Sequence, residues 1–410
     1  AGNGDHQGSG RVGGDGVMEI QKLKDICLTE ITDGTHQTPT YSEYGYIFLS
    51  SKNVTTQKID WDNVMFIPEK LHEELYKRVA PQIDDILLAK NGTTGVAAIV
   101  DRDIVFDIYV SLALIRPNTE IVMPRYLLYA INNPVVKGYF DSSLKGIGVP
   151  NLHLKNIRET PIKIYDLETQ KAIVEKLDKV CELISLRKQQ LEKLDELVKA
   201  RFVEMFGEIS DNSMNWDCFT IGKLISTIES GWSGNGKQRE KHADEIAVLK
   251  VSAVTKGYFI PTECKVLDDQ HNIKKYVYPQ KGDILFSRAN TKEMVGATVL
   301  IKKDYPDLIL PDKLWKIRFC TDVNPIYMKH VLSTTTVRNA FSAASTGTSG
   351  SMYNVSMEKF KGVIIPVPPL SVQNEFAAFV ERVDQQKQTV QQSLEKLELM
   401  KKALMQEYFG

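Results

Sequence analysis

The sequence predicts an α+β protein built as an internal duplication, in which two mixed α/β domains are separated by two long antiparallel coiled-coil helices with pseudo-twofold symmetry. Three features predict this class. A long segment recurs at an offset of 203 residues, each copy carries a heptad pattern, and short β-branched and aromatic runs precede each copy. With 410 residues, 42% hydrophobic and 25% charged, the chain is large enough for several domains.

The first 17 residues stand apart from this fold, because they hold seven glycines and no apolar periodicity. We expect a disordered leader or an added extension there. The remaining chain is expected to contain a first domain at 18–150, a central helical region at 151–217, a second domain at 218–353 and a C-terminal helical region at 354–410.

The repeat aligns residues 151–207 with residues 354–410 without a gap. The sequence Leu-Glu-Lys-Leu occurs at the same place in both copies, and Gln170 coincides with Gln373. The segments before the two copies correspond more loosely, through Asp85-Ile86-Leu87 with Asp283-Ile284-Leu285 and Pro124-x-Tyr126 with Pro325-x-Tyr327. The chain therefore consists of two half-repeats, each a globular part followed by a helix.

Short runs rich in β-branched and aromatic residues predict the strands of both globular halves. They lie at residues 46–49, 86–88, 96–100 and 110–115 in the first half, and at 246–251, 284–286, 297–301 and 314–319 in the second. Helical segments that begin with proline, at 124–131 and 325–332, interrupt them. Each half is therefore expected to be a mixed domain of about 130 to 150 residues, a usual domain size.

Positions spaced alternately four and three residues apart predict a coiled-coil seam in each copy. Apolar residues fill most of these positions from Ile173 to Met205 and from Phe376 to Tyr408. If Ile173 lies opposite Tyr408 in an antiparallel pair, every layer of the seam stays in step. We expect Asp166 to cap the first helix, since its side chain can accept bonds from the first turn.

Some seam positions are polar, and they bear on the same pairing. In the antiparallel register, Lys387 faces Leu194 and Arg201 faces Val380, so no layer places charge against charge. We expect each long stem to lie on its apolar partner with the charged head in water.

Composition excludes several classes of protein. No run of 18 apolar residues occurs and the N-terminus lacks the order of a secretory signal, so we expect a cytoplasmic protein that does not enter a membrane. The five cysteines are far apart and form no C-x-x-C pair, which argues against disulfides or a cysteine-rich zinc site. The net charge is −1, yet residues 218–366 hold 21 basic against 14 acidic residues, whereas residues 18–165 hold 16 against 18. The second half thus has the basic surplus typical of phosphate-binding domains.

No catalytic constellation is found in the sequence. Gly231-x-x-x-x-Gly236-Lys237 fits the start of a phosphate-binding loop, but position 238 is Gln instead of the Ser or Thr that holds magnesium. Glu263-x-Lys265 has the end of a nuclease motif without a suitable Pro-Asp pair before it, and the histidines lack ligand spacing. We therefore predict no catalytic residue, no metal and no cofactor.

Polar loops recur at equivalent places in both halves and combine residue types that bind bases and phosphates. Two such loops follow predicted strands in each half, and a third precedes each helical copy. The candidate DNA-binding residues are Lys52, Asn53, Lys90, Asn91, Thr93 and Lys145 in the first half, and Lys250, Ser252, Arg288, Asn290, Lys292 and Thr348 in the second.

Each of the two diverged globular halves is closed by a near-identical heptad helix, which starts with Leu-x-x-Gln at Leu167 or Leu370 and finishes with aromatic-Gly. In this arrangement the chain resembles the specificity subunit of type I restriction-modification enzymes. The resemblance covers residues 18–410. It implies that each globular half is a target recognition domain for one half of a split double-stranded DNA sequence. It also implies a non-catalytic subunit that docks two methyltransferase (M) subunits and the restriction (R) subunits.

Other classes remain open at this point. The prediction of an enzyme would rest only on the incomplete motifs above. The prediction of a coiled-coil scaffold that does not bind DNA would leave the globular halves without a role. Within DNA binding, the alternatives are the recognition module of another split-subunit restriction-methylation system and a DNA-binding scaffold without a restriction role. Leu186 and Leu197 lie off the seam and predict a partner-binding surface, unless they contact the globular halves.

Overall fold

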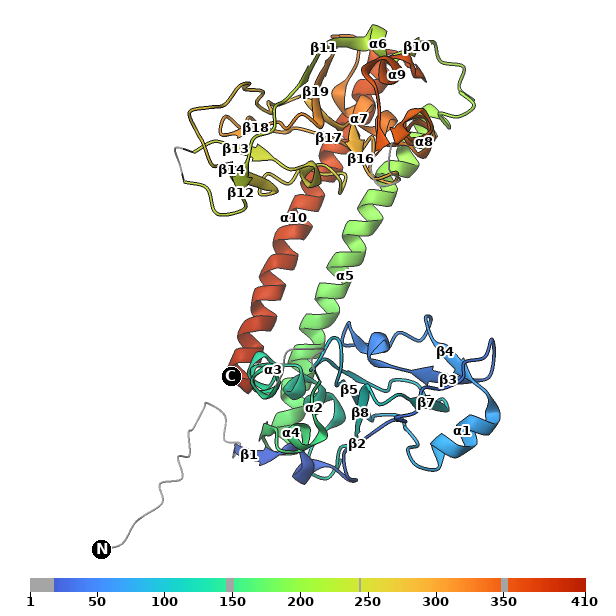
Figure 1. Cartoon of the computed structure of the whole chain (residues 1–410), viewed down its shortest axis with the longest axis vertical. Helices are drawn as coiled ribbons and strands as arrows, with labels where there is room; N and C mark the ends of the chain where they lie inside the picture. Colours follow the sequence, from blue (N-terminus) through green and yellow to red (C-terminus); the bar gives the residue numbers. More distant parts are fainter. Residues whose placement is uncertain (1–17, 145–150, 243–244, 348–352) are drawn as a thin grey trace, which may run out of the picture. The chain divides into compact units, whose positions relative to one another are not determined.

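The computed structural model describes residues 18–144, 151–242, 245–347 and 353–410. These residues form two compact units (Figure 1). Unit 1 extends to Lys188 and includes Gln392–Gly410, and unit 2 is Gln189–Gln391. Each unit thus contains one globular half together with segments of both long helices.

Unit 1 is built from short strands and short helices around one four-stranded sheet. Its strands are β1 (Glu19–Lys22), β2 (Thr32–Asp33), β3 (Tyr46–Leu49), β4 (Met65–Ile67), β5 (Ile86–Ala89), β6 (Ala97–Ile99), β7 (Phe106–Ile108), β8 (Leu112–Ile115) and β9 (Pro161–Ile164). Its short helices are η1 (Leu23–Ile26), η2 (Ser51–Val54), α1 (Glu69–Tyr76), α2 (Pro124–Ile131), α3 (Pro134–Ser143) and α4 (Leu154–Arg158).

Unit 2 repeats this plan. Its strands are β10 (Cys218–Thr220), β11 (Ile225–Ser230), β12 (Gly236–Lys237), β13 (Ala247–Leu249), β14 (Cys264–Leu267), β15 (Ile284–Ser287), β16 (Ala289–Asn290), β17 (Thr298–Leu300), β18 (Leu308–Ile309), β19 (Leu314–Phe319), β20 (Thr346–Gly347), β21 (Tyr353–Asn354) and β22 (Ile364–Pro366). Its short helices are α6 (Ile221–Leu224), η3 (Val251–Ala253), α7 (Pro325–Ser333), α8 (Thr335–Ala344) and α9 (Met357–Gly362).

The sheet topologies confirm the duplication. The main sheet has the order β2-β8-β5-β6 in unit 1 and β11-β19-β15-β17 in unit 2. A second sheet has the order β4-β3-β7 in unit 1 and β12-β14-β13-β18 in unit 2, with a parallel pair of strands in each. The second sheet of unit 2 therefore has an additional edge strand, β12. The predicted α+β class and internal repeat are confirmed.

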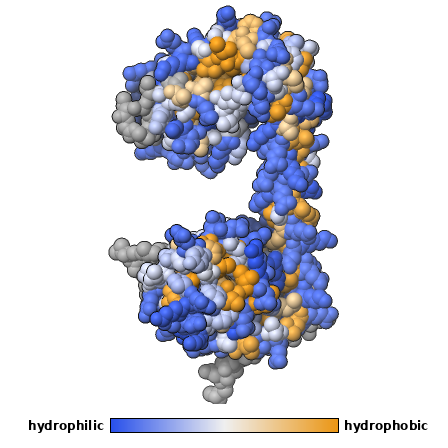
Figure 2. Space-filling model, turned by 90° about the vertical axis from the view of Figure 1, so that its right-hand side faces the viewer, coloured by the Kyte–Doolittle hydropathy of each residue, from blue (hydrophilic) through white to orange (hydrophobic). Residues whose placement is uncertain are grey.

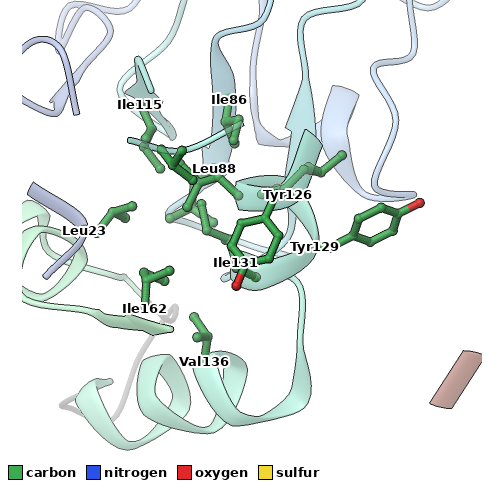
Figure 3. Close-up of a cluster of buried hydrophobic side chains, with 14 of the residues drawn as sticks. Leu23, Ile86, Leu88, Ile115, Tyr126, Tyr129, Ile131, Val136 and Ile162 are labelled. Carbon is green, nitrogen blue, oxygen red and sulfur yellow. The ribbon is translucent and has the colours of Figure 1, made fainter. Parts of the chain in front are cut away.

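Each unit has two main hydrophobic clusters, one between its main sheet and the helices that follow it and one that joins the main sheet to the second sheet. Figure 3 shows the first of these clusters in unit 1, where side chains of β5 and β8, such as Ile86 and Ile115, face Tyr126 and Ile131 of α2. All four residues are fully buried. Unit 2 has the equivalent cluster around Ile284 and the α7 residues.

A buried carboxylate holds the main sheet at the same place in both units. Arg116 donates to both oxygens of Asp85, at 2.8 and 2.7 Å. In unit 2, Arg318 donates to Asp283 at 2.6 Å, and each aspartate also accepts a bond from the backbone three residues before it. This charge-assisted pair explains why the Asp-Ile-Leu sequence recurs.

The repeated glutamines join the long helices to the globular parts. The Gln170 side chain accepts a bond from Met123 N at 2.8 Å and donates to Tyr165 O, whereas Gln373 accepts from Asn324 N at 2.8 Å and donates to Pro368 O. Both glutamines are fully buried. Each therefore satisfies backbone groups at the start of α2 or α7 that would otherwise be buried without a partner.

The long helices are α5 (Leu167–Phe206) and α10 (Leu370–Phe409). Every predicted seam position is buried or half-buried, and most residues between seam positions are exposed. Asp166 accepts a bond from Thr169 N at 2.8 Å, which confirms the predicted cap. Within the described ranges, none of the helices is apolar enough over a sufficient length to cross a membrane.

Antiparallel pairing of the two helices is confirmed within each unit. In unit 1, Lys176 donates to the hydroxyl of Tyr408 at 3.2 Å, and Lys188, further along α5, pairs with Glu398, earlier in α10, at 3.3 Å. In unit 2, Asp195 pairs with Lys387, and the guanidinium of Arg201 lies 5.9 Å from the ring centre of Phe379. The charged side chains at the seam are partly exposed, and they also form ion pairs that were not expected. Lys387 forms an ion pair with Asp195, and Arg201 forms one with Glu375 at 3.1 Å, because acidic residues of the opposite helix flank the seam.

Candidate nucleic-acid interface

In unit 1 the carboxyl ends of β2, β3, β5 and β7 lie together. β2 and β5 are both antiparallel to β8, and β3 is parallel to β7. A parallel bridge between Thr35 and Tyr109 joins the end of β2 to the end of β7, so these four strands end at one edge. The loops that follow them, with residues 151–152, form what we call loop edge 1. Loops at such an edge are held by a rigid scaffold and commonly carry binding residues.

Backbone bonds join the segments of loop edge 1. Lys90 N donates to Ser111 O at 2.8 Å, and Leu152 N donates to Lys90 O at 2.9 Å. Ser51 N donates to the hydroxyl of Ser111 at 3.0 Å. The segment around Lys90 thus lies between the loop after β7 and the chain that leads to α4.

Unit 2 has the same arrangement, called loop edge 2, at the ends of β11, β13, β15 and β18. Arg288 N donates to Lys313 O at 3.1 Å, and Val355 N donates to Arg288 O at 2.9 Å. These bonds reproduce those of Lys90. The structure therefore places Lys90 and Arg288 at equivalent positions.

Two glycines close the central loop of each edge in the same way. Gly95 and Gly296 have φ angles of 82° and 81°, a left-handed conformation that favours glycine. A Cβ on either would lie 3.0 Å from the ring of Phe140 or Phe341. The loops between these fixed ends differ in length, because residues 90–94 in unit 1 correspond to residues 288–295 in unit 2.

The predicted DNA-binding residues differ in exposure. Lys52, Thr93 and Lys292 are exposed on their loops. Half-buried members of the set are Asn91, Lys250, Ser252, Arg288 and Asn290. Lys145 and Thr348 lie outside the described residues, although the chain that follows each of them joins its loop edge.

Two predicted residues are buried and bonded within the protein. Lys90 Nζ lies 2.5 Å from Asp33 Oδ2, and both side chains are less than one-tenth exposed. The side-chain amide of Asn53 donates to Asp60 O at 3.3 Å and to Asn63 O at 3.0 Å. Both side chains therefore hold the shape of loop edge 1 in this conformation and present little surface to a ligand.

In unit 2, acidic side chains position the predicted residues. Glu263 forms an ion pair with Lys250 at 2.8 Å and accepts a bond from the Ser252 hydroxyl at 2.6 Å. These two bonds lower the pKa of Glu263, so it stays ionised. Arg288 is held by a backbone group instead, since its Nε donates to Asp312 O at 2.9 Å.

The loop after β11 was noted in the sequence only as an incomplete phosphate-binding motif, and the loop after β2 was not noted at all. Each begins with a glycine, Gly34 or Gly231, at which a Cβ would lie within 2 Å of a backbone oxygen of the second sheet. Thr35 N and Trp232 N then donate to the same oxygens, those of Ile108 and Leu310. A glycine directly after a strand at the same place in both halves is the signal that could have located these loops.

The incomplete motifs do not assemble a catalytic centre. Residues 236 and 237 form strand β12, where a phosphate-binding loop would lead into a helix. Glu263 is engaged by Lys250 and Ser252, as described above. In the part of the chain that the structure describes, no group of three or more His, Cys, Asp or Glu residues could hold a metal ion.

The predicted partner-binding leucines lie on the surface of α5. Leu186 and Leu197 are 50% and 46% exposed, and apolar patches interrupt the mostly hydrophilic surface along the helices (Figure 2). Leu197 also lines a groove of roughly 500 Å³ in unit 2, whose other lining residues come from α5 and α10 and are Ala200, Arg201, Glu204, Glu375, Phe379 and Arg382.

A family model described as the type I restriction modification DNA specificity domain matches residues 17–196 and, a second time, residues 215–399. The chain belongs to this family of type I restriction-modification specificity subunits. The two matched segments correspond to the two copies of the repeat, so this specificity subunit has two specificity domains.

Curated relatives and solved structures agree with this assignment. The subunit is 23% identical over 371 residues to the type I restriction enzyme EcoKI specificity subunit of Escherichia coli (strain K12), which covers 86% of this chain and 78% of that one. It is 22% identical over 413 residues to the putative type I restriction enzyme MjaX specificity subunit of Methanocaldococcus jannaschii, covering 94% and 91%.

Among solved structures, the fold is similar to the S subunit of a type I restriction-modification system from M. genitalium, with a TM-score of 0.59, 11% identity and 98% of each chain covered. A chain from a structure of an assembled type I R-M system gives a TM-score of 0.54 at 18% identity, covering 97% of this chain and 98% of that one.

Proposed function

We propose that this specificity subunit binds a bipartite double-stranded DNA target, one half through loop edge 1 and the other through loop edge 2, and positions two M subunits and the R subunits around it. The subunit itself catalyses no step in this proposal. Chemistry at the DNA would come from the partner subunits, and the complex would act on cellular DNA in the cytoplasm.

The observation that carries this proposal is that one loop edge is built twice, with the same backbone bonds at Lys90 and Arg288 and with different side chains around them. A repeated scaffold with different polar loops suits a protein that reads two different half-sites. We propose that the recognition domains extend over 18–150 and 218–353, as the repeat suggests.

The direct contacts are proposed for the exposed and half-buried loop residues, with Asn91, Thr93 and Lys52 on loop edge 1 and Arg288 and Lys292 among those on loop edge 2. Arg can donate two bonds to a base edge, and Asn can donate one bond and accept another, whereas Lys and Thr suit phosphates. Since residues 218–366 hold the basic surplus, loop edge 2 should supply more of the salt-dependent affinity.

We propose that the M subunits dock on the exposed faces of α5 and α10, at Leu186 and at the groove that Leu197 lines. Exposed apolar side chains on a helix that already buries its seam are typical of a further interface. Charged substitutions at Leu186 and Leu197 should prevent co-purification with an M subunit. Retained co-purification of both variants would remove these leucines from the interface.

The continuous helix α5 motivates a further part of the proposal, that the coiled coil sets the unread gap between the half-sites. At about 1.5 Å per residue, the seam from Ile173 to Met205 is roughly 48 Å long, which corresponds to roughly 14 base pairs at most. Four residues inserted near Gln189 should lengthen the gap by on the order of one or two base pairs without changing either half-sequence. An unchanged gap in an active enzyme would exclude this role.

The experiment that tests the proposal is co-expression of the chain with M subunits, followed by mapping of methylated adenines across the host genome. The expected result is one split sequence with a fixed gap, methylated only when both proteins are present. Methylation at an unsplit sequence, or the same methylation by the M subunits alone, would contradict it.

A further inference from the structure

Loop edge 1 contains a buried carboxylate that binds three cationic or polar nitrogens. Asp33, which is 3% exposed, lies 2.5 Å from Lys90 Nζ through Oδ2. Its other oxygen, Oδ1, lies 3.2 Å from His36 Nε2 and 3.4 Å from Arg78 Nη2. Oδ2 therefore faces a buried lysine, whereas Oδ1 faces two side chains that are more than half exposed.

The charges in this cluster do not balance. Burial raises the pKa of Asp33, but the bonds from Lys90 and His36 outweigh burial and leave the pKa below its usual value, so the carboxylate is ionised. One negative charge neutralises the buried Lys90. The Arg78 guanidinium, 53% exposed, then adds a positive charge at the surface of the edge.

Arg78 is held in place by two contacts while about half of its side chain stays exposed. Its Nη1 donates to Gly34 O at 3.3 Å and its Nη2 contacts Asp33, which engages two of the five N–H groups of a guanidinium. The His36 ring is 66% exposed beside it on the same carboxylate oxygen. An arginine that is fixed in advance loses little side-chain entropy when it binds an anion.

We propose that Arg78 and His36, oriented by Asp33, bind a phosphate of the DNA backbone at loop edge 1. This inference rests on the proposed function, and it adds residues that lie outside the loops predicted from the sequence. Arg78 and His36 are the binding residues, and Asp33 is a positioning residue that acts through them.

Among the described residues of unit 2, this arrangement is absent at the equivalent place, which supports a role specific to unit 1. Gly231 is equivalent to Gly34, so Ser230 takes the position of Asp33, and Arg288 itself donates to a backbone oxygen at the edge. Residues 18–165 carry more acidic than basic residues, whereas residues 218–366 carry a basic surplus. A domain with little overall positive charge needs fixed local donors to hold a polyanion.

The test measures DNA affinity of the complex of this chain with its M subunits, on the mapped target duplex and on a non-target duplex, between 50 and 200 mM salt. Loss of one phosphate contact makes the slope of log affinity against log salt shallower by about 0.9. When the salt concentration rises over this range, the affinity of Arg78→Ala should therefore fall by a factor roughly three times smaller than the factor for the parent protein. The weakening should be similar on both duplexes, Arg78→Lys should keep most of the slope, and His36→Ala should weaken binding less than Arg78→Ala.

Arg102→Ala is the matched control. Arg102 is exposed in the same unit but lies after β6, at the opposite end of the main sheet, and its loss should leave the slope unchanged. Thermal unfolding of each variant checks that the fold is retained. A parent complex without target preference would contradict the proposed function. If the parent complex prefers its target, an unchanged salt slope in Arg78→Ala would overturn the phosphate site. A loss of preference at one base only in Arg78→Ala would overturn it as well.

Discussion

The two units have the same skeleton and hold their loop edges differently. In both units an aspartate holds the main sheet, a glutamine joins the long helix to the globular part, and a glycine closes the central loop. These residues are Asp85 and Asp283, Gln170 and Gln373, and Gly95 and Gly296. At the edge itself, Lys90 is buried against a carboxylate, whereas Arg288 is half-buried against a backbone oxygen. The residues that the two copies share thus support the fold, whereas the residues that differ lie at the loop edges, where we propose that each unit reads its own half-site.

The units also differ where α2 and α7 pack on the long helices. In unit 1 the hydroxyl of Tyr129 donates to Asp178 at 2.5 Å. In unit 2 the equivalent residue, His330, lies against the rings of Phe202 and Phe376, with centroid distances of 6.1 and 5.1 Å. One helix contact is thus a polar pair and the other is an aromatic cluster.

The largest expected effect concerns the aromatic residue at the end of each long helix. Phe206 packs on Tyr327 at 4.8 Å in unit 2, and Phe409 packs on Tyr126 at 5.3 Å in unit 1. Alanine at either should cost about 3–5 kcal/mol in the free energy of unfolding, because a large buried ring is lost. Phe206→Ala should destabilise more, since Phe202 and Phe376 also contact that ring.

Hydrogen exchange resolves the two effects. Phe206→Ala should lower protection in unit 2 and Phe409→Ala in unit 1, while Phe219→Ala, at a residue 38% exposed, should change little. Equal loss of protection in both units from either variant would contradict the division of roles.

The second prediction contrasts Lys90 with Arg288. Lys90→Ala should cost about 3 kcal/mol of stability, because it leaves a buried carboxylate without its main partner. Arg288→Ala should cost only about 1 kcal/mol of stability, and it should weaken DNA binding by about 1–3 kcal/mol if the guanidinium reads a base. Thermal unfolding and DNA affinity, measured on the same complexes, check both.

The asparagine variants complete that contrast. Asn91→Ala and Asn290→Ala should keep the fold and reduce DNA binding. If Asn91→Ala, Arg288→Ala and Asn290→Ala all kept the parent affinity and salt dependence, the central loops would not be part of the interface.

The third prediction concerns the buried glutamines, where the units should behave alike. Gln170→Ala and Gln373→Ala each leave backbone groups buried without a partner, at a cost of about 1–3 kcal/mol. The melting temperature should fall by a similar amount in both. A neutral effect of one substitution would show that its helix junction is held by other contacts.

The smallest expected effect is a pH dependence of unit 2 between pH 7 and pH 5 that is set by His330. Burial, and then Lys329 and Lys387, lower the pKa of His330 well below its ordinary 6.5, so the folded chain keeps the ring neutral. Below pH 6.5 the unfolded chain takes up a proton that the folded chain does not, so the free energy of unfolding falls as the pH falls and is unaffected above it.

Replacing His330 with the residue of unit 1 tests this assignment. His330→Tyr should remove the acid sensitivity, because burial raises the pKa of the equivalent Tyr129 and that hydroxyl stays neutral throughout this range. Hydrogen exchange of unit 2 between pH 7 and pH 5 measures the effect. The same acid sensitivity in the parent and in His330→Tyr would assign it to another group.

Long or strongly patterned elements were predictable from the sequence, and short ones were not. The predicted helix 124–131 coincides with α2, and the heptad seams match the buried positions of α5 and α10. Strands such as β2 and β18 have only two residues, which is too few for an alternating pattern to be recognised. They form because the neighbouring strands supply backbone partners.

The position of the candidate site in each half was predictable from the sequence, but the burial and contacts of its side chains were not. The equivalence of Lys90 and Arg288 followed from the repeat, and the structure confirms it. The burial of Lys90 did not follow, because its partner Asp33 is 57 residues away along the chain. Arg78 was missed for the same reason, since only the fold brings it to Asp33.

The most direct test of the account exchanges residues 18–150 for the corresponding domain of a relative with another target and maps methylated adenines in cells that also express the M subunits. Because each loop edge is complete within its own unit, one half of the methylated sequence should change while the other half and the gap stay the same. The reciprocal exchange of residues 218–353 should change the other half only. Simultaneous change of both half-sequences after either exchange would contradict the claim that the two units read DNA independently.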